Sequence, residues 1–162
     1  MIQFREENRS DRSAIFKVVT AAFSQRAEAQ LVDALRGAGD VVISLVADDD
    51  GEIVGHVLLS KMIASFSALA LAPVSVIPTR QREGIGSALI ERAVHRARSE
   101  GWEAIFVLGA PAYYERFGFS REAASGFTSP YAGEHFMMLK LLPSLTATNG
   151  DLRHAPAFGA LD

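Results

Sequence analysis

The sequence predicts one domain of the α/β class, a mixed sheet flanked by helices, and three observations carry that prediction. Three segments repeat apolar residues at helical spacing. An Asp-Gly pair between two apolar runs is a strong signal of a β-hairpin. A strand–helix–strand unit over residues 69–108 implies two neighbouring parallel strands with a right-handed crossover. Because the hairpin adds antiparallel pairing, the sheet is mixed.

Two amphipathic helices open the predicted order. Ser10 or Asp11 caps the first, because a short polar side chain can accept a hydrogen bond from the free amides of a first turn. Gly37 and Gly39 end the second, since glycine favours helix ends. The apolar stripes are Ile15, Val18, Val19, Ala22 and Phe23 in the first helix, and Ala27, Leu31, Ala34, Leu35 and Ala38 in the second.

Strands are predicted over residues 41–47 and 53–60, joined by the acidic turn at 48–52. Two further strands are predicted over residues 69–76 and 104–108. The last is a continuous apolar run, which is typical of a strand buried on both faces.

A third helix is predicted from Gly84 to a stop at Gly101, with one apolar and one charged face. Residues 111–116 predict a short helix, and a last strand is predicted near residues 135–141. The pattern of residues 144–162 is weaker and predicts an extended arm.

Composition narrows the class of protein. The chain has 162 residues, 49% of them hydrophobic, and a formal net charge of -3. With no cysteine, disulfides, thiolate metal sites and a cysteine nucleophile are excluded. We expect no nucleic-acid or membrane partner, because no basic stripe is present and the apolar stretch at 62–78 is too short and too interrupted to span a bilayer.

The charged N-terminus does not resemble a signal peptide, so a cytoplasmic location is expected. No repeat or linker divides the chain. The expected organisation is one domain over residues 1–143, with a C-terminal extension over 144–162 packing on the same domain.

The segment most informative about function lies between a predicted strand and the third helix. It reads Gln81-Arg82-Glu83-Gly84-Ile85-Gly86-Ser87. Free amides at a helix start bind phosphate, and glycines let the backbone approach it closely. A Walker loop needs Gly-Lys-Ser/Thr, and a dinucleotide fingerprint needs a small residue where Leu89 stands. Both common nucleotide interpretations therefore fail.

This segment resembles the acetyl-CoA pyrophosphate loop of the GNAT superfamily of N-acetyltransferases, Gln/Arg-x-x-Gly-x-Gly/Ala. Val76-Ile77-Pro78 precedes it, as in the strand exit of that family. Tyr114-Glu115-Arg116-Phe117-Gly118-Phe119 is similar to the family's Tyr-Glu-x-x-Gly-Phe box. The resemblance covers roughly residues 2–142. Residues 108–114 and 150–158 resemble the bacterial YhbS-like branch.

The resemblance implies a mostly antiparallel sheet in which two parallel central strands splay apart, and acetyl-CoA as co-substrate without a metal. Val74, Ser75 and Val76 match the strand that pairs with the pantetheine arm, and the amide of Val76 would polarise the thioester carbonyl. Tyr114 matches the residue that donates a hydrogen bond to the leaving sulfur as general acid. The pyrophosphate loop matches Gln81, Arg82, Glu83, Gly84, Ile85, Gly86 and Ser87.

The implied reaction is transfer of acetyl to a primary amine by direct attack in a ternary complex. The acceptor is a small molecule or a peptide, and a homodimer is an open alternative. A non-catalytic CoA-binding sensor or structural module, or a transferase for a longer acyl group, is the competing interpretation. The non-catalytic alternative is kept because of a departure from the family pattern: many relatives carry a Glu on the strand near 104–108 and an Asn shortly afterwards, and this chain has neither.

The general base is therefore unassigned. The substitutes to consider are His56, His135, Glu28 and Glu134. Structural interpretations stay open beside the functional ones: Tyr114 as an ordinary buried tyrosine, Arg82 as a solvated charge and His56 as a half-exposed histidine of the sheet.

Overall fold

The computed structural model describes residues 1–161 and shows a six-stranded sheet in the order β1-β2-β3-β4-β5-β7. All neighbours are antiparallel except β4 and β5, which are parallel. The strands span Ile2–Glu6 (β1), Val41–Asp49 (β2), Glu52–Lys61 (β3), Ala68–Val76 (β4), Ala104–Leu108 (β5) and Phe136–Lys140 (β7). The predicted mixed, mostly antiparallel sheet is confirmed.

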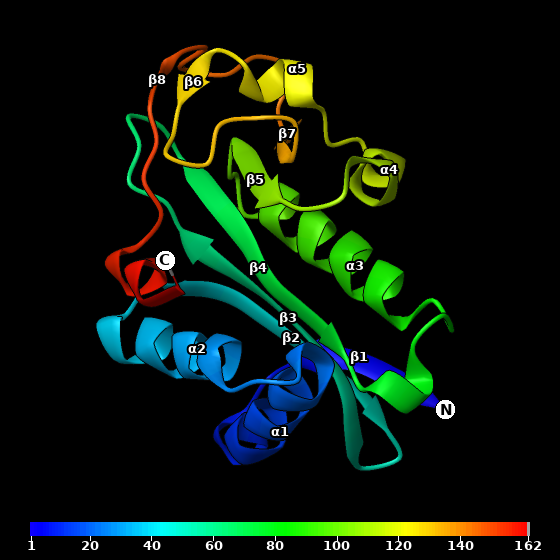
Figure 1. Ribbon diagram of the computed structural model, residues 1–162. Helices are drawn as coiled ribbons and strands as arrows, with labels where there is room; N and C mark the ends of the chain where they lie inside the picture. The colour runs from blue at the N-terminus through cyan, green and yellow to red at the C-terminus, as the bar shows by residue number, and fades with distance from the viewer. Residues whose placement is uncertain (162) are drawn as a thin grey trace.

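Helices cover both faces of the sheet (Figure 1). One face carries α1 (Arg12–Phe23) and α2 (Ala27–Ala38), and the other carries α3 (Ile85–Ser99). Two short helices, α4 (Pro111–Tyr114) and α5 (Arg121–Ala124), follow β5. Short 3-10 turns lie at Arg9–Asp11, Pro78–Arg80, Glu115–Phe117 and Pro156–Leu161.

The hairpin between β2 and β3 turns at Asp50 and Gly51, as the acidic Asp-Gly segment predicted. Both residues have positive φ, 50° and 97°, which is the pattern of a type I′ turn. Its backbone twist matches that of the flanking strands, which is why Asp-Gly is favoured there.

Three local features differ from the prediction. Strand β1 was not predicted, although it pairs with β2 from Ile2 opposite Asp49. Asp11 is the N-cap residue of α1, but its side chain makes no hydrogen bond to that helix; its carboxylate accepts the backbone N–H of Asn8, whose own side chain caps the preceding 3-10 turn. Gly37 lies inside α2, and only Gly39, at φ 77°, ends that helix.

The C-terminal segment is not simply an extended arm. A short strand, β8 (Gly150–Asp151), pairs in parallel with β6 (Phe127–Thr128), and a 3-10 turn follows at Pro156–Leu161. Ala155 and Phe158 are buried against α1 and α2. Asp162, the end of the expected extension, lies outside the described residues.

Candidate active site

The parallel pair at the centre of the sheet separates after three residues. β4 and β5 are in register only from Ala68 opposite Ala104 to Ala70 opposite Phe106. The rest of β4, Leu71 to Val76, has β3 on one side and no strand on the other. The splay expected between these strands is therefore present.

Backbone groups of β4 point into this gap. The amide of Ile77 donates to the carbonyl of Val54 on β3 at 3.0 Å. Because successive residues of a strand direct their backbone groups to opposite sides, Val76 and Val74 face away from β3. The Gln81 side-chain amide donates to the outward carbonyl of Val76 at 3.1 Å, which fits this orientation. A ligand with amide groups could pair with these positions as a strand does.

The loop after β4 is built to leave amides free. Arg82 and Gly84 have positive φ, 67° and 84°, and α3 then starts at Ile85 without a side-chain cap. The amide of Ala88 donates to the carbonyl of Gly84 at 3.0 Å. The amides of the three residues before Ala88 precede the first intrahelical bond, at the positive end of the helix dipole. This arrangement favours an anion.

A cavity of about 510 Å³ joins the end of β4 to this loop. Its lining residues are Val74, Val76, Arg80, Gln81, Arg82, Gly84, Ile85, Gly86, Ser87, Tyr113 and Arg116. It thus brings together all the predicted cofactor-binding residues except Ser75 and Glu83. The Ser75 side chain is buried outside the cavity, and Glu83 forms an ion pair with Arg80 at 3.1 Å. We call this space the loop cavity.

Tyr114 does not itself line the loop cavity; it follows Tyr113, which does, and it is buried, with 9% of its surface exposed. Its ring contacts the rings of Tyr113 and Phe119 at centroid distances of 5.0 and 5.8 Å. Burial, and secondarily the neighbouring Tyr113, raises the pKa of Tyr114 to about 12. The pKa is therefore perturbed upward, and the phenol keeps its proton at neutral pH. No hydrogen bond holds its hydroxyl within residues 1–161.

Three residues that line the loop cavity were not predicted as binding groups: Arg80, which is paired with Asp49 and Glu83, and Tyr113 and Arg116. Arg116 belongs to the Tyr-Glu-x-x-Gly-Phe segment but stands at one of its variable positions. The Tyr113 hydroxyl would be 3.3 Å from a Cβ placed on Gly86, so it lies against the start of α3. The sequence does not indicate that Tyr113 and Arg116 lie near residues 81–87, because only the folded chain brings α4 and the turn after it to the loop.

His56 is fully buried, so the half-exposed histidine expected at this position is wrong. Its Nε2 lies 2.8 Å from Ser44 Oγ, which also hydrogen bonds to Glu7, and Arg36 pairs with Glu7 at 2.9 Å. An ionised Glu7 only accepts, so Ser44 donates to it and His56 Nε2 donates to Ser44. Burial lowers the pKa of His56 to about 4, so the ring is neutral at pH 7.

The other candidate bases also lie away from the loop cavity. Glu28 accepts from the Gln25 side chain at 2.9 Å at the start of α2. Glu134 and His135 precede β7, are exposed, and lie 3.4 Å apart. The His135 Nδ1 is 3.3 Å from the carbonyl of Gly109, the residue that follows β5.

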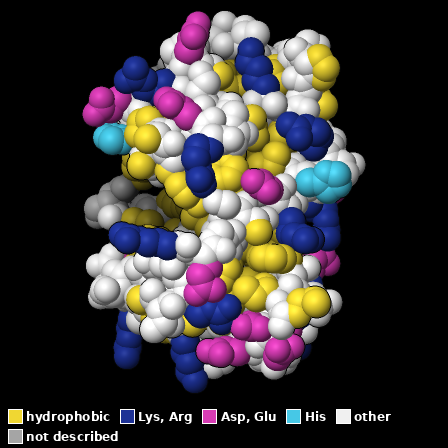
Figure 2. Space-filling model, turned by 90° about the vertical axis from the view of Figure 1, so that its right-hand side faces the viewer, with side chains coloured by type: hydrophobic (Ala, Val, Ile, Leu, Met, Phe, Trp, Pro, Cys, Tyr) yellow, Lys and Arg dark blue, Asp and Glu magenta, His cyan; other side chains and the backbone are white. Residues whose placement is uncertain are grey.

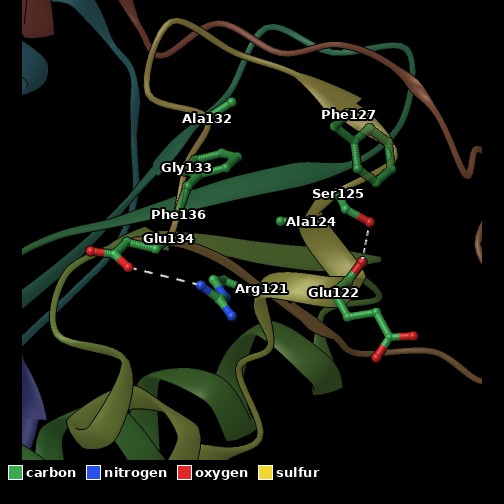
Figure 3. A pocket seen from close by; sticks show the side chains of 9 residues that line it. All are labelled: Arg121, Glu122, Ala124, Ser125, Phe127, Ala132, Gly133, Glu134 and Phe136. Carbon is green, nitrogen blue, oxygen red and sulfur yellow. Dashed lines mark hydrogen bonds and ion pairs between the residues drawn. The ribbon is translucent and has the colours of Figure 1, made fainter.

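A second cavity, of about 460 Å³, lies between α5 and the segment that enters β7 (Figure 3). Phe127, Phe136 and Ala124 give it an apolar wall, while Arg121 and Glu134 form an ion pair at 4.0 Å at its edge. Phe136 stands opposite Leu108 at the end of β5. This cavity, called the apolar cavity below, is therefore next to the strand end that leads to Tyr114.

The side of the molecule that carries α3 has a mixed surface charge. Figure 2 shows basic and acidic side chains interspersed over that face. Among residues 1–161, no group of three or more His, Asp or Glu side chains is placed to hold a metal ion. Within the same residues, no helix combines the length and apolar character needed to cross a membrane.

Comparison with known proteins decides the family. The sequence profile of the Acetyltransferase (GNAT) family matches residues 5–119. The chain belongs to the GNAT family of N-acetyltransferases. It is 36% identical over 155 residues to the uncharacterized N-acetyltransferase YjhQ of Escherichia coli K12, covering 89% of this chain and 84% of YjhQ.

Two solved GNAT structures extend the comparison. The crystal structure of Escherichia coli YhbS in complex with CoA superposes with a TM-score of 0.91 at 27% identity, covering 98% of this chain and 92% of that one. A GNAT acetyltransferase from Brucella melitensis in complex with acetyl-CoA gives 0.84 at 33% identity, with 98% of each chain covered. The family, the fold and the N-acetyltransferase class expected from the sequence are confirmed.

Proposed function

We propose that this GNAT chain binds acetyl-CoA in the loop cavity and transfers the acetyl group to a primary amine by direct attack in a ternary complex. The observation that carries the proposal is the continuity of the loop cavity from the unpaired backbone of β4 to the free amides of α3. Such a path fits a long ligand that has amide groups at one end and a pyrophosphate at the other.

Positioning is the main contribution expected of the site. The pantetheine arm of acetyl-CoA would pair with the backbone groups of Val74 and Val76 that face away from β3. The pyrophosphate would accept hydrogen bonds from the amides of residues 85–87. Holding the thioester and the amine together converts a bimolecular reaction into one within a complex. An amide of β4 would stabilise the oxyanion that forms when the amine attacks the carbonyl.

Tyr114 is assigned to the departing sulfur. Its pKa of about 12 lies above that of an alkyl thiol, about 8.5 for cysteine, so complete proton transfer to the thiolate is unfavourable. A hydrogen bond from the phenol to the developing thiolate remains available, because the hydroxyl makes no other bond within residues 1–161. The proposed role is therefore donation of a hydrogen bond to the sulfur.

The amine is proposed to arrive uncharged or to lose its proton to solvent. β5 carries no carboxylate, and neither His56, Glu28, Glu134 nor His135 lines the loop cavity. A neutral amine attacks the carbonyl, the carbon–sulfur bond breaks, and the surplus proton of the product leaves to water. This scheme predicts that the rate falls as the pH drops below the pKa of the acceptor amine, because only the neutral amine attacks.

The acceptor is proposed to enter over the apolar cavity. Its wall of Phe127 and Phe136 suits an apolar group attached to the amine, and the cavity borders the end of β5. Ala132 is exposed at its edge, so Ala132→Trp should fill the cavity without disturbing the core. The variant should raise the KM for an accepted amine and leave the affinity for acetyl-CoA unchanged; an unchanged KM would contradict this placement.

The experiment for the function is CoA release from acetyl-CoA with a panel of primary amines, read by thiol titration. Amine-dependent release supports the proposal. Binding of acetyl-CoA without release for any small amine or peptide N-terminus contradicts it and favours a CoA-binding module. Release from longer acyl-CoA at a higher kcat/KM than from acetyl-CoA would replace acetyl by that acyl group.

A further inference from the structure

Arg116 is held in a fixed position over the start of α3. Its Nη2 donates to Ser87 Oγ at 2.8 Å, and its Nε donates to the carbonyl of Tyr113 at 3.3 Å. The guanidinium also stacks on the rings of Tyr113 and Phe117, at 4.8 and 5.2 Å from their centroids. These contacts fix a cation at the edge of the loop cavity and leave part of its donor fork free.

The charges around the loop cavity do not balance. Three arginines line it, and Arg80 is paired with Asp49 at 2.8 Å and with Glu83 at 3.1 Å. Within residues 1–161, neither Arg82 nor Arg116 has a carboxylate partner. Acidic residues are not scarce, since the chain has 19 of them against 16 basic residues. Two uncompensated cations therefore share one cavity, which favours a ligand with more negative charge than the loop amides neutralise.

Arg116 reaches the amide site from another segment of the chain. The free amides are backbone groups of the loop and the first turn of α3, whereas Arg116 arrives from the segment after α4 and reaches the Ser87 side chain. With the amides occupied by the pyrophosphate, the free part of the Arg116 guanidinium can bind a second phosphate beside it. Arginine suits it, because its fork binds phosphate through two parallel hydrogen bonds.

We propose that Arg116, together with Arg82, binds the 3′-phosphate on the ribose of CoA, so that the chain selects CoA over 3′-dephospho-CoA. The inference rests on the proposed function, since it needs CoA in the loop cavity. It adds a residue pair that determines cofactor specificity.

The test is calorimetric titration of CoA and of 3′-dephospho-CoA into the wild-type chain, Arg116→Ala and Arg82→Ala. The wild type should bind CoA at least ten times more tightly than dephospho-CoA, and the preference should shrink with added salt. Arg116→Ala should lose most of the preference by weakening CoA alone, with dephospho-CoA affinity within about twofold of wild type. Arg116→Lys should be intermediate, since it keeps the charge and loses the fork.

Arg92→Ala is the matched control. Arg92 also stacks on a ring, 4.8 Å from the centroid of Phe4, but does not line the loop cavity, so its loss should leave both affinities unchanged. Equal weakening of both ligands by Arg116→Ala would overturn the inference and assign Arg116 to the pyrophosphate or to folding. Equal binding of the two ligands by the wild type would overturn it as well. Failure of the wild type to bind either ligand would instead contradict the proposed function.

Discussion

The ring of Tyr114 lies so close to the backbone of Gly109 that a Cβ at position 109 would stand 2.5 Å from Cε2 of the ring. Gly109 follows the last residue of β5, so this contact sets the ring against the end of the strand. The phenol is therefore positioned by packing against a glycine and neighbouring aromatic rings, which leaves its hydroxyl free to meet a ligand.

Gly109→Ala should reduce acetyl transfer strongly, because the added methyl group must displace the Tyr114 ring. We expect a fall of about tenfold or more in kcat, as expected when a catalytic group is misplaced by about 1 Å. Gly37→Ala is the matched control: nothing lies within 4 Å of its Cβ, and it is inside α2. It should keep activity and raise the free energy of unfolding by about 0.5–1 kcal/mol. Full activity of Gly109→Ala would contradict the claim that acetyl transfer needs the Tyr114 ring in this position.

Tyr114→Phe tests the hydroxyl itself. The variant keeps the packing and should lower kcat by about 100-fold, the effect typical of removing one hydrogen-bond donor from the negative charge that develops in the transition state. The KM for acetyl-CoA should change less than threefold. Tyr113→Phe is its neighbour control, and should act on cofactor affinity more than on kcat, because its hydroxyl lies at Gly86 in the loop cavity. Steady-state kinetics with both variants separates the two roles; an undiminished kcat for Tyr114→Phe would exclude the sulfur contact.

His56 should make stability depend on pH between about 6.5 and 4. Its pKa is about 4 in the folded chain and near 6.5 when unfolded, so in this range the unfolded state binds more protons. Stability is then complete above pH 6.5 and falls by about 3 kcal/mol as the pH drops to 4. Urea unfolding of the wild type and of His56→Asn across this range measures the difference.

The partly buried charges next to His56 affect the same unfolding experiment. Arg36, through its charge, adds to the lowering of the His56 pKa, while Glu7 opposes it. Contacts with Arg36 and Ser44 lower the pKa of Glu7 despite its partial burial, so the stability that Glu7 contributes is lost only below its unfolded pKa of 4.5. A parallel pH dependence in wild type and His56→Asn would contradict the assignment to His56.

Glu103 should anchor the C-terminal segment. Its carboxylate accepts the amides of Ser67 and Thr146 at 2.9 and 2.8 Å and the Thr146 hydroxyl at 2.7 Å, which also lowers its pKa. Glu103→Ala leaves these donors unpaired and should cost about 1–3 kcal/mol of stability. Limited proteolysis should then cut first after residue 142. Glu52→Ala, at an exposed position of the hairpin, should cost little; equal losses in the two variants would contradict the anchor.

The sequence predicted those elements whose conformation is determined by residues close together in the chain. The Asp-Gly turn, the glycine start of α3 and the apolar run of β5 each carry their own signal, and the structure has them as predicted. Strand β1 was missed because it is short, holds Gln3, Arg5 and Glu6, and pairs with residues more than 35 positions away.

In the site, too, features with a local sequence signal could be predicted, and features that depend on distant contacts could not. The amide loop could be predicted from the glycines and the helix that follows them. Arg116 could not, because its contact with Ser87 spans 29 residues. The burial of His56 could not be predicted either, since it depends on Ser44, Glu7 and Arg36 from three other segments.

The most direct test of the account is a calorimetric titration of acetyl-CoA into the wild-type chain and into Gly86→Val. Gly86 lines the loop cavity, and a side chain there would stand in the path of the ligand and 3.3 Å from the Tyr113 hydroxyl. We expect one binding site in the wild type and an affinity at least tenfold weaker in Gly86→Val, with Gly37→Ala unchanged. Absence of binding by the wild type, or equal affinity in Gly86→Val, would contradict acetyl-CoA binding in the loop cavity.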